Sequence, residues 1–146
     1  SYDLECEGSP ERDMRDPVAS VKLASDIVHN NGMKFMIAPS RALTSLYAAE
    51  FAKYVDIYSI QAQSLQSQPN EYKKYVEKIV MEITSTNPEI SITAQVSTVR
   101  GSLQSMKNSI SSVEGVIDGV TSWYSGNQKA LDKLERFVKW FVDRYK

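Results

Sequence analysis

The feature that most restricts the fold of this chain is its regular alternation of short apolar segments with amphipathic ones, without the turn pattern of a β-hairpin. Strands are predicted from the apolar segments, over residues 3–7, 34–39, 55–63, 90–99 and 116–124. Helices are predicted from the amphipathic segments between and after them, over residues 17–31, 43–54, 71–86, 102–112 and 128–145. Strict alternation of strand and helix is typical of parallel strands joined by crossover helices. We therefore expect an α/β fold with five parallel strand–helix units, in a single domain over residues 1–146.

Two architectures meet this expectation: an open, doubly wound parallel sheet of five strands, and part of an eight-stranded barrel. Strands of a doubly wound sheet are covered on both faces and have continuous apolar sequences. Here polar residues alternate with apolar ones in the third and fourth predicted strands, at Ser59, Gln61, Gln63, Thr93, Gln95 and Ser97. Inward side chains that line a site are typical of the mouth of a barrel. We therefore favour a partial (β/α)8 TIM barrel, the C-terminal part of one that lacks about three N-terminal units.

Three acidic residues stand at every second position near the start of the chain, Asp3, Glu5 and Glu7, directly before a Gly-Ser-Pro break. Alternate residues of a strand point to the same face, so we expect the three carboxylates to form one column. Their mutual repulsion raises the pKa of at least one of them, which disfavours folding and suits proton transfer. The alternative is an acidic edge strand or N-terminal tail in contact with solvent.

The composition excludes several classes of function. Lys and Arg number 17 against 18 Asp and Glu, and no basic cluster interrupts the sequence, so nucleic acid and anionic membranes are not expected partners. No apolar run approaches the length of a membrane span, which is about 18 residues. Cys6 is the only cysteine and His29 the only histidine, so neither an internal disulfide nor a cysteine metal site is possible. No metal or cofactor is predicted, and His29 is expected to stabilise the end of helix 17–31.

The acidic column resembles the end of the strand-four motif of chitinase-type (family 18) glycoside hydrolases, with Glu5 where that family has aspartate. Later segments resemble further strands of the same barrel in order, with residues 35–39 as the fifth strand, 55–63 as the sixth and 119–124 as the eighth. The resemblance implies a barrel enzyme that acts on polysaccharide without a cofactor.

The resemblance also implies roles for individual residues. Glu7 would be the general acid that protonates the glycosidic oxygen. Glu5 would hold that acid and orient the N-acetyl group of the substrate, and Asp3 would tune Glu5. Trp123 would stack on a sugar ring.

Other candidate binding groups lie at the predicted strand ends. Gln61, Gln63 and Gln95 are placed on adjacent inward faces, where amides offer donors and acceptors to hydroxyl groups. Arg41 follows Pro39 and Ser40 at a strand-to-helix turn, where it could reach a carboxylate, although an exposed arginine is the default expectation.

Departures from the family leave other functions open. Gln63 stands where the family has a tyrosine, and Glu5 is longer than aspartate by one methylene. The first hypothesis is therefore a glycoside-hydrolase-like barrel, and the second is a non-catalytic barrel that binds carbohydrate or another polar ligand. A third is a doubly wound signalling domain that holds Mg²⁺ in the acidic column, although no glycine-rich phosphate loop follows the first strand.

The ends of the predicted sheet also indicate a partner. Five units cannot close a barrel, so we expect an open edge on each side, covered by a missing N-terminal segment or by a second copy of the chain. The sequence begins at Ser1 inside a predicted strand. A removed signal peptide, which would place the protein outside the cell, is one explanation, and truncation is the other.

Overall fold

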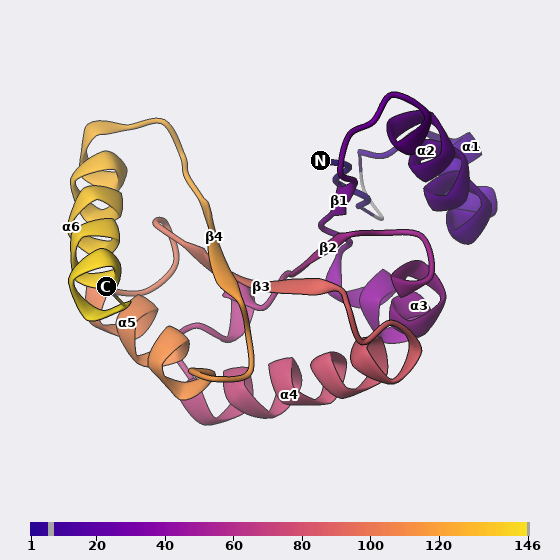
Figure 1. Ribbon diagram of the computed structural model, residues 1–146. Coiled ribbons are helices and arrows are strands. Elements are labelled where there is room, and N and C mark those ends of the chain that lie inside the picture. The colour runs from indigo at the N-terminus through magenta and orange to yellow at the C-terminus, as the bar shows by residue number, and fades with distance from the viewer. Residues whose placement is uncertain (6–7, 146) are drawn as a thin grey trace.

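A four-stranded parallel sheet forms the centre of the computed structural model, which describes residues 1–5 and 8–145 (Figure 1). The strands are β1 (Met36–Ile37), β2 (Ile57–Ile60), β3 (Ser91–Ser97) and β4 (Gly119–Trp123), and they lie in the order β1-β2-β3-β4. Tyr58 in β2 lies opposite Ile37 on one side and Ile92 on the other, and Ala94 in β3 lies opposite Val120. The predicted α/β class, with parallel strands joined by helices, is confirmed.

Six α-helices and one 3-10 helix are found in the described ranges: α1 (Glu11–Arg15), α2 (Pro17–Asn30), α3 (Arg41–Ala52), η1 (Gln63–Leu65), α4 (Pro69–Thr86), α5 (Leu103–Ser112) and α6 (Gln128–Tyr145). Helices α2 and α5 begin at residues whose side chains cap them. Asp16 accepts a hydrogen bond from Ala19 N at 3.0 Å, and Ser102 accepts one from Ser105 N at 3.1 Å. The short helix α1 was not predicted, because five residues are too few for an apolar period to be recognised.

The N-terminal segment extends the sheet beside β1 but forms less of a strand than predicted. Tyr2 and Ile37 make a single parallel bridge, and Tyr2 N donates to Met36 O at 2.8 Å. Leu4 is fully buried and its carbonyl accepts from Ser40 N at 2.9 Å. The pairing stops there on the β1 side because α3 begins at Arg41, directly after Ser40. On the other side, Glu5 N donates to the Ser9 hydroxyl at 2.9 Å. The end of the predicted strand, Cys6 and Glu7, lies outside the described residues.

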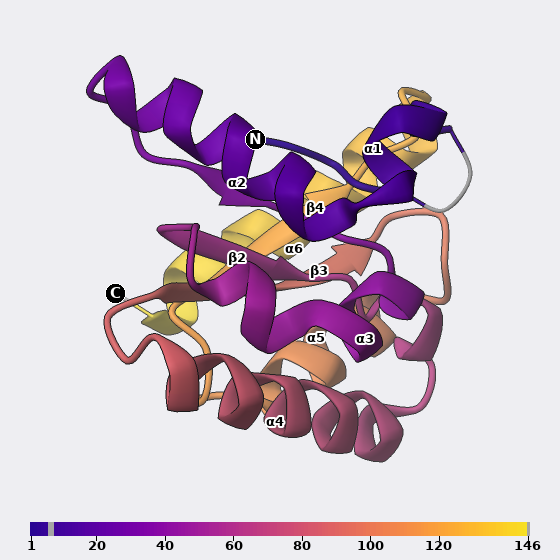
Figure 2. The ribbon, with the colours of Figure 1, turned by 90° about the vertical axis from the view of Figure 1, so that its right-hand side faces the viewer.

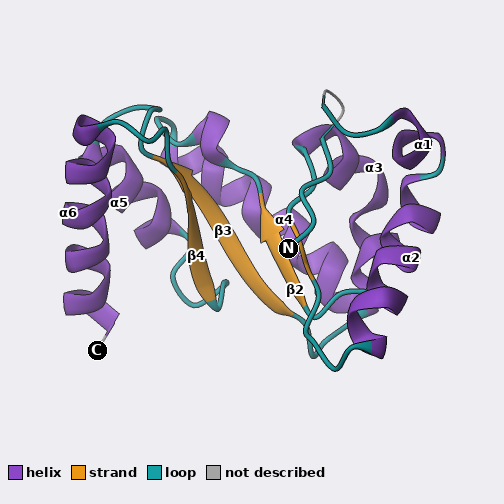
Figure 3. Cartoon of the chain, turned by 90° about the horizontal axis from the view of Figure 1, so that it is seen from above, coloured by secondary structure: helices purple, strands orange, loops and turns teal. Residues whose placement is uncertain are grey.

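The helices gather on one side of the sheet. In Figure 1 the helices from α2 to α6 form an arc around the strands, and Figure 2 shows α3 and α4 packed along the same side of β2 and β3. Figure 3 shows the opposite face, where no helix lies in front of β2, β3 and β4. The core fills the space between strands and helices, and its sheet side includes Tyr58, Ile60, Ile92, Ala94 and Val96, all buried. The predicted alternation in β2 and β3 therefore gives an apolar face toward the helices and a polar face on the open side.

A buried glutamine fixes the loop after β2. The Gln66 side chain is fully buried, its Oε1 accepts from Ser97 N at 2.7 Å, and its Nε2 donates to Ser97 O at 3.1 Å and to Arg100 O. The hydroxyl of Ser109 in α5 donates to Gln66 O at 2.9 Å. These bonds attach the segment that contains η1 to the carboxyl end of β3. Among the helices of the described ranges, none has the length and apolar character needed to cross a membrane.

Candidate functional site

A polar pocket lies where β2, β3 and β4 end and the N-terminal segment approaches them. Its volume is about 320 Å³, and its lining residues are Asp3, Glu5, Gln61, Gln63, Gln95, Ser97, Val99, Arg100 and Trp123. The carboxyl ends of parallel strands are where α/β folds place their ligand sites, because loops from different units meet there.

The centre of the pocket is an amide between two carboxylates. Gln61 Nε2 donates to Glu5 Oε1 at 2.7 Å and to Ala38 O at 2.8 Å, and it lies 3.2 Å from Asp3 Oδ1. The backbone bonds of Leu4 hold Asp3 and Glu5 on the same side of their segment, since residues two apart in an extended chain share a face. Asp3 and Glu5, the two acids of the column that the structure describes, therefore lie close together, and Gln61, just after β2, contacts both.

Glu5 has the properties of a carboxyl group that can hold a proton. Burial raises the pKa of Glu5 above its ordinary value, and the neighbouring Asp3 raises it further, while the hydrogen bond from Gln61 acts in the opposite direction. The raised pKa increases the protonated fraction at a given pH, and a protonated carboxyl can donate to a neighbouring oxygen.

Two buried amide oxygens of the pocket accept no hydrogen bond from the described residues. Gln63 Nε2 donates to Gln61 Oε1 at 3.2 Å, but the buried Oε1 of Gln63 finds no donor among the described residues. The buried Oε1 of Gln95 is in the same situation. Buried acceptors without a donor are costly, and a ligand with hydroxyl or amine hydrogens can satisfy them.

An aromatic side chain and a cation complete the pocket. Trp123, at the end of β4, is 49% exposed, and its carbonyl accepts from Thr98 N at 3.0 Å, which fixes the backbone beneath the ring. Arg100 lines the pocket from the loop after β3 and is exposed. The pocket thus combines acids, amides, one cation and an accessible ring.

The structure places six of the predicted site residues in this pocket: Asp3, Glu5, Gln61, Gln63, Gln95 and Trp123. It does not bring Arg41 there, because α3 begins at Arg41 and the side chain lies over the Tyr75 ring, 4.8 Å from its centroid, and donates to the Ser64 hydroxyl at 2.9 Å. Glu7, the predicted general acid, lies outside the described residues.

Sequence reasoning did not select Val99 or Ser97 for the site. The strand pattern placed Ser97 on the inward face, so that signal was present. Val99 lies in the loop after β3, where no sequence period indicates the direction of a side chain.

The histidine lies at the other end of the strands. His29 Nε2 lies 2.8 Å from Asp56 Oδ2, and its Nδ1 lies 3.2 Å from the hydroxyl of Ser25. These are the residue types of a hydrolytic triad, but Ser25 is buried and its hydroxyl donates to Tyr54 O, so it is not available as a nucleophile. Asp56 also accepts from Phe35 N at 2.7 Å, so the group ties α2 to the segments before β1 and β2.

Within residues 1–5 and 8–145, no three His, Cys, Asp or Glu side chains are close enough together to hold a metal ion. No protein-family model, curated protein or solved structure matches this chain. The functional argument therefore rests on the geometry of the pocket.

Proposed function

We propose that this chain is part of a (β/α)8-type barrel that binds carbohydrate in the polar pocket and cleaves it with Glu7 as the general acid. One observation carries the proposal: Glu5 and the accessible ring of Trp123 line the same pocket, at the carboxyl ends of parallel strands. The pKa of Glu5 is raised there. An acid beside an aromatic platform is suited to a sugar ring with a cleavable oxygen.

The order of the strands supports a barrel. The order β1-β2-β3-β4 follows the chain, whereas a doubly wound sheet reverses its order at a switch point. With right-handed crossovers, a sheet that never reverses carries its helices on one face and curves around the other. Inner polar contacts such as that between the Ser59 and Thr121 hydroxyls, 2.7 Å apart, fit a curved inner face. Closure to eight strands would need further units at the β4 edge and at the N-terminal edge.

The choice of a hydroxyl-rich ligand follows from the acceptors in the pocket. Glu5, Asp3 and the unsatisfied amide oxygens of Gln63 and Gln95 can all accept hydrogen bonds. A sugar supplies several hydroxyl donors from one ring, and its apolar face can lie on Trp123.

The chemistry proposed for the acids depends on their spacing. Glu7 stands two positions after Glu5 in the sequence, and residues two apart in an ideal strand have about 7 Å between their Cβ atoms. That spacing is wide for a direct nucleophile and suits a substrate that assists its own cleavage. In this scheme Glu7 gives its proton to the glycosidic oxygen, and Glu5, hydrogen-bonded to Gln61, orients the assisting group.

The test uses chitin oligosaccharides, because the resemblance to chitinase-type enzymes implies an N-acetylated sugar. Binding is measured by calorimetry and cleavage by product release. Trp123→Ala should weaken binding about tenfold, and Tyr124→Ala, at an exposed neighbour that does not line the pocket, should not change it. Glu7→Gln should lower turnover by roughly 100-fold to 10,000-fold and leave binding intact.

A second candidate function is binding without cleavage. The observation in its favour is that Gln63, at the position of the family's tyrosine, donates to Gln61 and offers no phenolic hydroxyl to a reacting acetamide. Binding that depends on Trp123, without product from the native chain, would select this function. If no chitin oligosaccharide bound, or if Trp123→Ala and Tyr124→Ala behaved alike, the sugar proposal would fail.

A further inference from the structure

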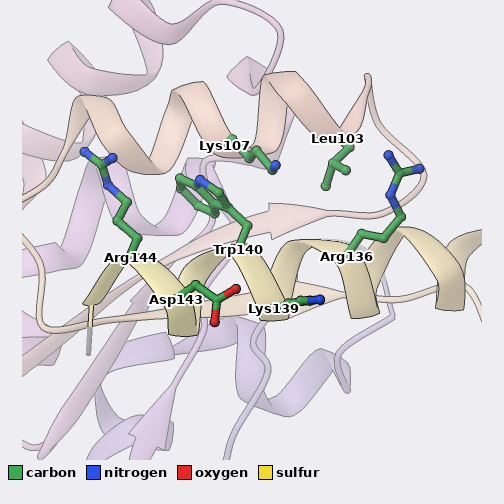
Figure 4. A pocket seen from close by; sticks show the side chains of 7 residues that line it. All are labelled: Leu103, Lys107, Arg136, Lys139, Trp140, Asp143 and Arg144. Atoms are coloured by element: carbon green, nitrogen blue, oxygen red, sulfur yellow. The ribbon is translucent and has the colours of Figure 1, made fainter.

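A second pocket, of about 580 Å³, lies between α5 and α6 and shares no residue with the polar pocket. Lys107 and Leu103 reach it from α5, and α6 provides the remaining wall (Figure 4). Figure 4 shows Arg136 and Arg144 rising from α6 on either side of Trp140. We call this the α5–α6 pocket.

The α5–α6 pocket concentrates positive charge on a chain whose net charge is −1. Four cations line it, Lys107, Arg136, Lys139 and Arg144, with Asp143 as the only lining carboxylate among the described residues. Arg144 pairs with Glu114 at 2.8 Å. The other three cations have no ion-pair partner in the described part of the chain. Gathered cations without counter-charges repel one another, and an anionic ligand relieves that repulsion.

A rigid aromatic wall stands between the cations. Trp140 is half-buried, and its ring centroid lies 5.6 Å from that of Phe137 and 6.5 Å from that of Phe141. Lys107 Nζ lies 5.5 Å from the Trp140 centroid and Arg144 Cζ 5.9 Å from it. The ring therefore holds its position and keeps both cations close to the pocket.

The start of α5 adds to the positive potential. Leu103, which lines the pocket, is the first residue of this ten-residue helix, so the amino end of α5 lies beside the pocket. Helix amino ends carry a partial positive charge that favours anions. This contribution adds to that of the side chains.

We propose that the α5–α6 pocket binds an anionic oligosaccharide, one that carries sulfate or carboxylate groups. The volume is that of a small-ligand site. Arg136, Lys139 and Lys107 would pair with the acidic groups, and Trp140 and Leu103 would contact the apolar edge of a ring. The proposal goes beyond the function of the polar pocket and depends on different residues.

The test measures binding of a sulfated hexasaccharide by calorimetry, with a neutral hexasaccharide and an oligothymidylate of equal charge as comparisons. The native chain should bind the sulfated sugar at least about tenfold more tightly than the neutral one, which only the polar pocket would take, and at least about tenfold more tightly than the oligothymidylate. The double variant Arg136→Gln, Lys139→Gln should lose about tenfold or more in affinity, since each side chain loses a charge-assisted bond. Both positions are exposed, so these changes should not impair folding.

A matched control removes the same charge elsewhere. Lys73→Gln with Lys78→Gln alters two exposed lysines of α4 that lie 3.6 Å and 3.7 Å from Glu77 and Glu82. The control should keep the affinity of the native chain. Equal loss in control and test variants would mean a general charge effect and would overturn the proposal, as would unchanged binding in the test variant. Tighter binding of the oligothymidylate would reassign the pocket to nucleic acid.

Discussion

The amide nitrogen of Gln61 lies 2.7 Å from the carboxylate of Glu5, although 56 positions separate the two residues in the sequence. This contact joins the N-terminal segment to the carboxyl end of β2 and creates the acidic side of the polar pocket. It also acts on the pKa of Glu5: burial raises this pKa, and the hydrogen bond partly offsets the rise because it stabilises the charged form.

Replacing Gln61 by methionine should therefore raise the pKa of Glu5 further. The variant keeps the length of the side chain and removes the donor. The measurement is a carboxyl NMR titration of Glu5. Gln63→Met is the control, because Gln63 donates to Gln61 Oε1 and not to Glu5, so its effect on the pKa of Glu5 should be small. An unchanged or lower pKa in Gln61→Met would contradict the role assigned to this bond.

The raised pKa of Glu5 predicts a loss of stability as the pH rises. A carboxyl whose pKa is higher in the fold than in the unfolded chain binds its proton more tightly in the fold. Its favourable contribution is complete below the ordinary value of 4.5 and is lost as the pH rises through the higher value in the fold. Urea unfolding of the native chain and of Glu5→Gln across this range checks the prediction, since the variant should lack this part of the pH dependence. A difference between the two that does not vary with pH would refute it.

The lowered pKa of Asp56 predicts the opposite pH dependence of stability. Burial alone would raise its pKa, but the hydrogen bonds from Phe35 N and His29 lower it below the ordinary value. Its contribution is therefore present above the unfolded-state pKa and is lost as the pH falls through the lower value in the fold. Asp56→Asn should cost about 1–2 kcal/mol near neutral pH and less in acid, measured by urea unfolding. Asp26→Asn, which breaks an exposed pair with Lys22 at 2.7 Å, should cost under about 1 kcal/mol, and a larger loss there than at Asp56 would contradict this assignment.

The buried side chain of Gln66 should be among the most sensitive positions. Gln66→Leu removes both hydrogen-bonding groups and leaves Ser97 N and the carbonyls of Ser97 and Arg100 without this partner. We expect a loss of about 2–4 kcal/mol in the free energy of unfolding, measured by urea denaturation. Gln68→Leu is the control, because Gln68 is exposed and its side chain does not cap α4. Equal stability of the two variants would show that the Gln66 bonds contribute little.

The strand pattern predicted more of the site than the motifs alone. Period-two alternation is local information, and it placed Gln61 and Gln95 on the open face because the apolar faces of β2 and β3 must pack on helices. The position of Arg41 could not be predicted in this way. Its side chain is held by Tyr75, a residue of another helix, and contacts between helices are not encoded in a local period.

The α5–α6 pocket was missed for a related reason. Lys107 and Arg136 are far apart in the sequence. From the sequence alone, each is expected to be an ordinary exposed cation on its own helix. The sequence analysis found no basic cluster because the cluster forms only when two helices pack side by side.

The side chain that joins the loops after β2 and β3 has a thermodynamic consequence for recognition. Gln66 bonds to Ser97 and to Arg100, which both line the polar pocket, so these two residues are held in place without help from an incoming molecule. Binding would then cost little conformational entropy, because these loops are already ordered. The contacts with a bound molecule would therefore contribute more fully to the binding free energy.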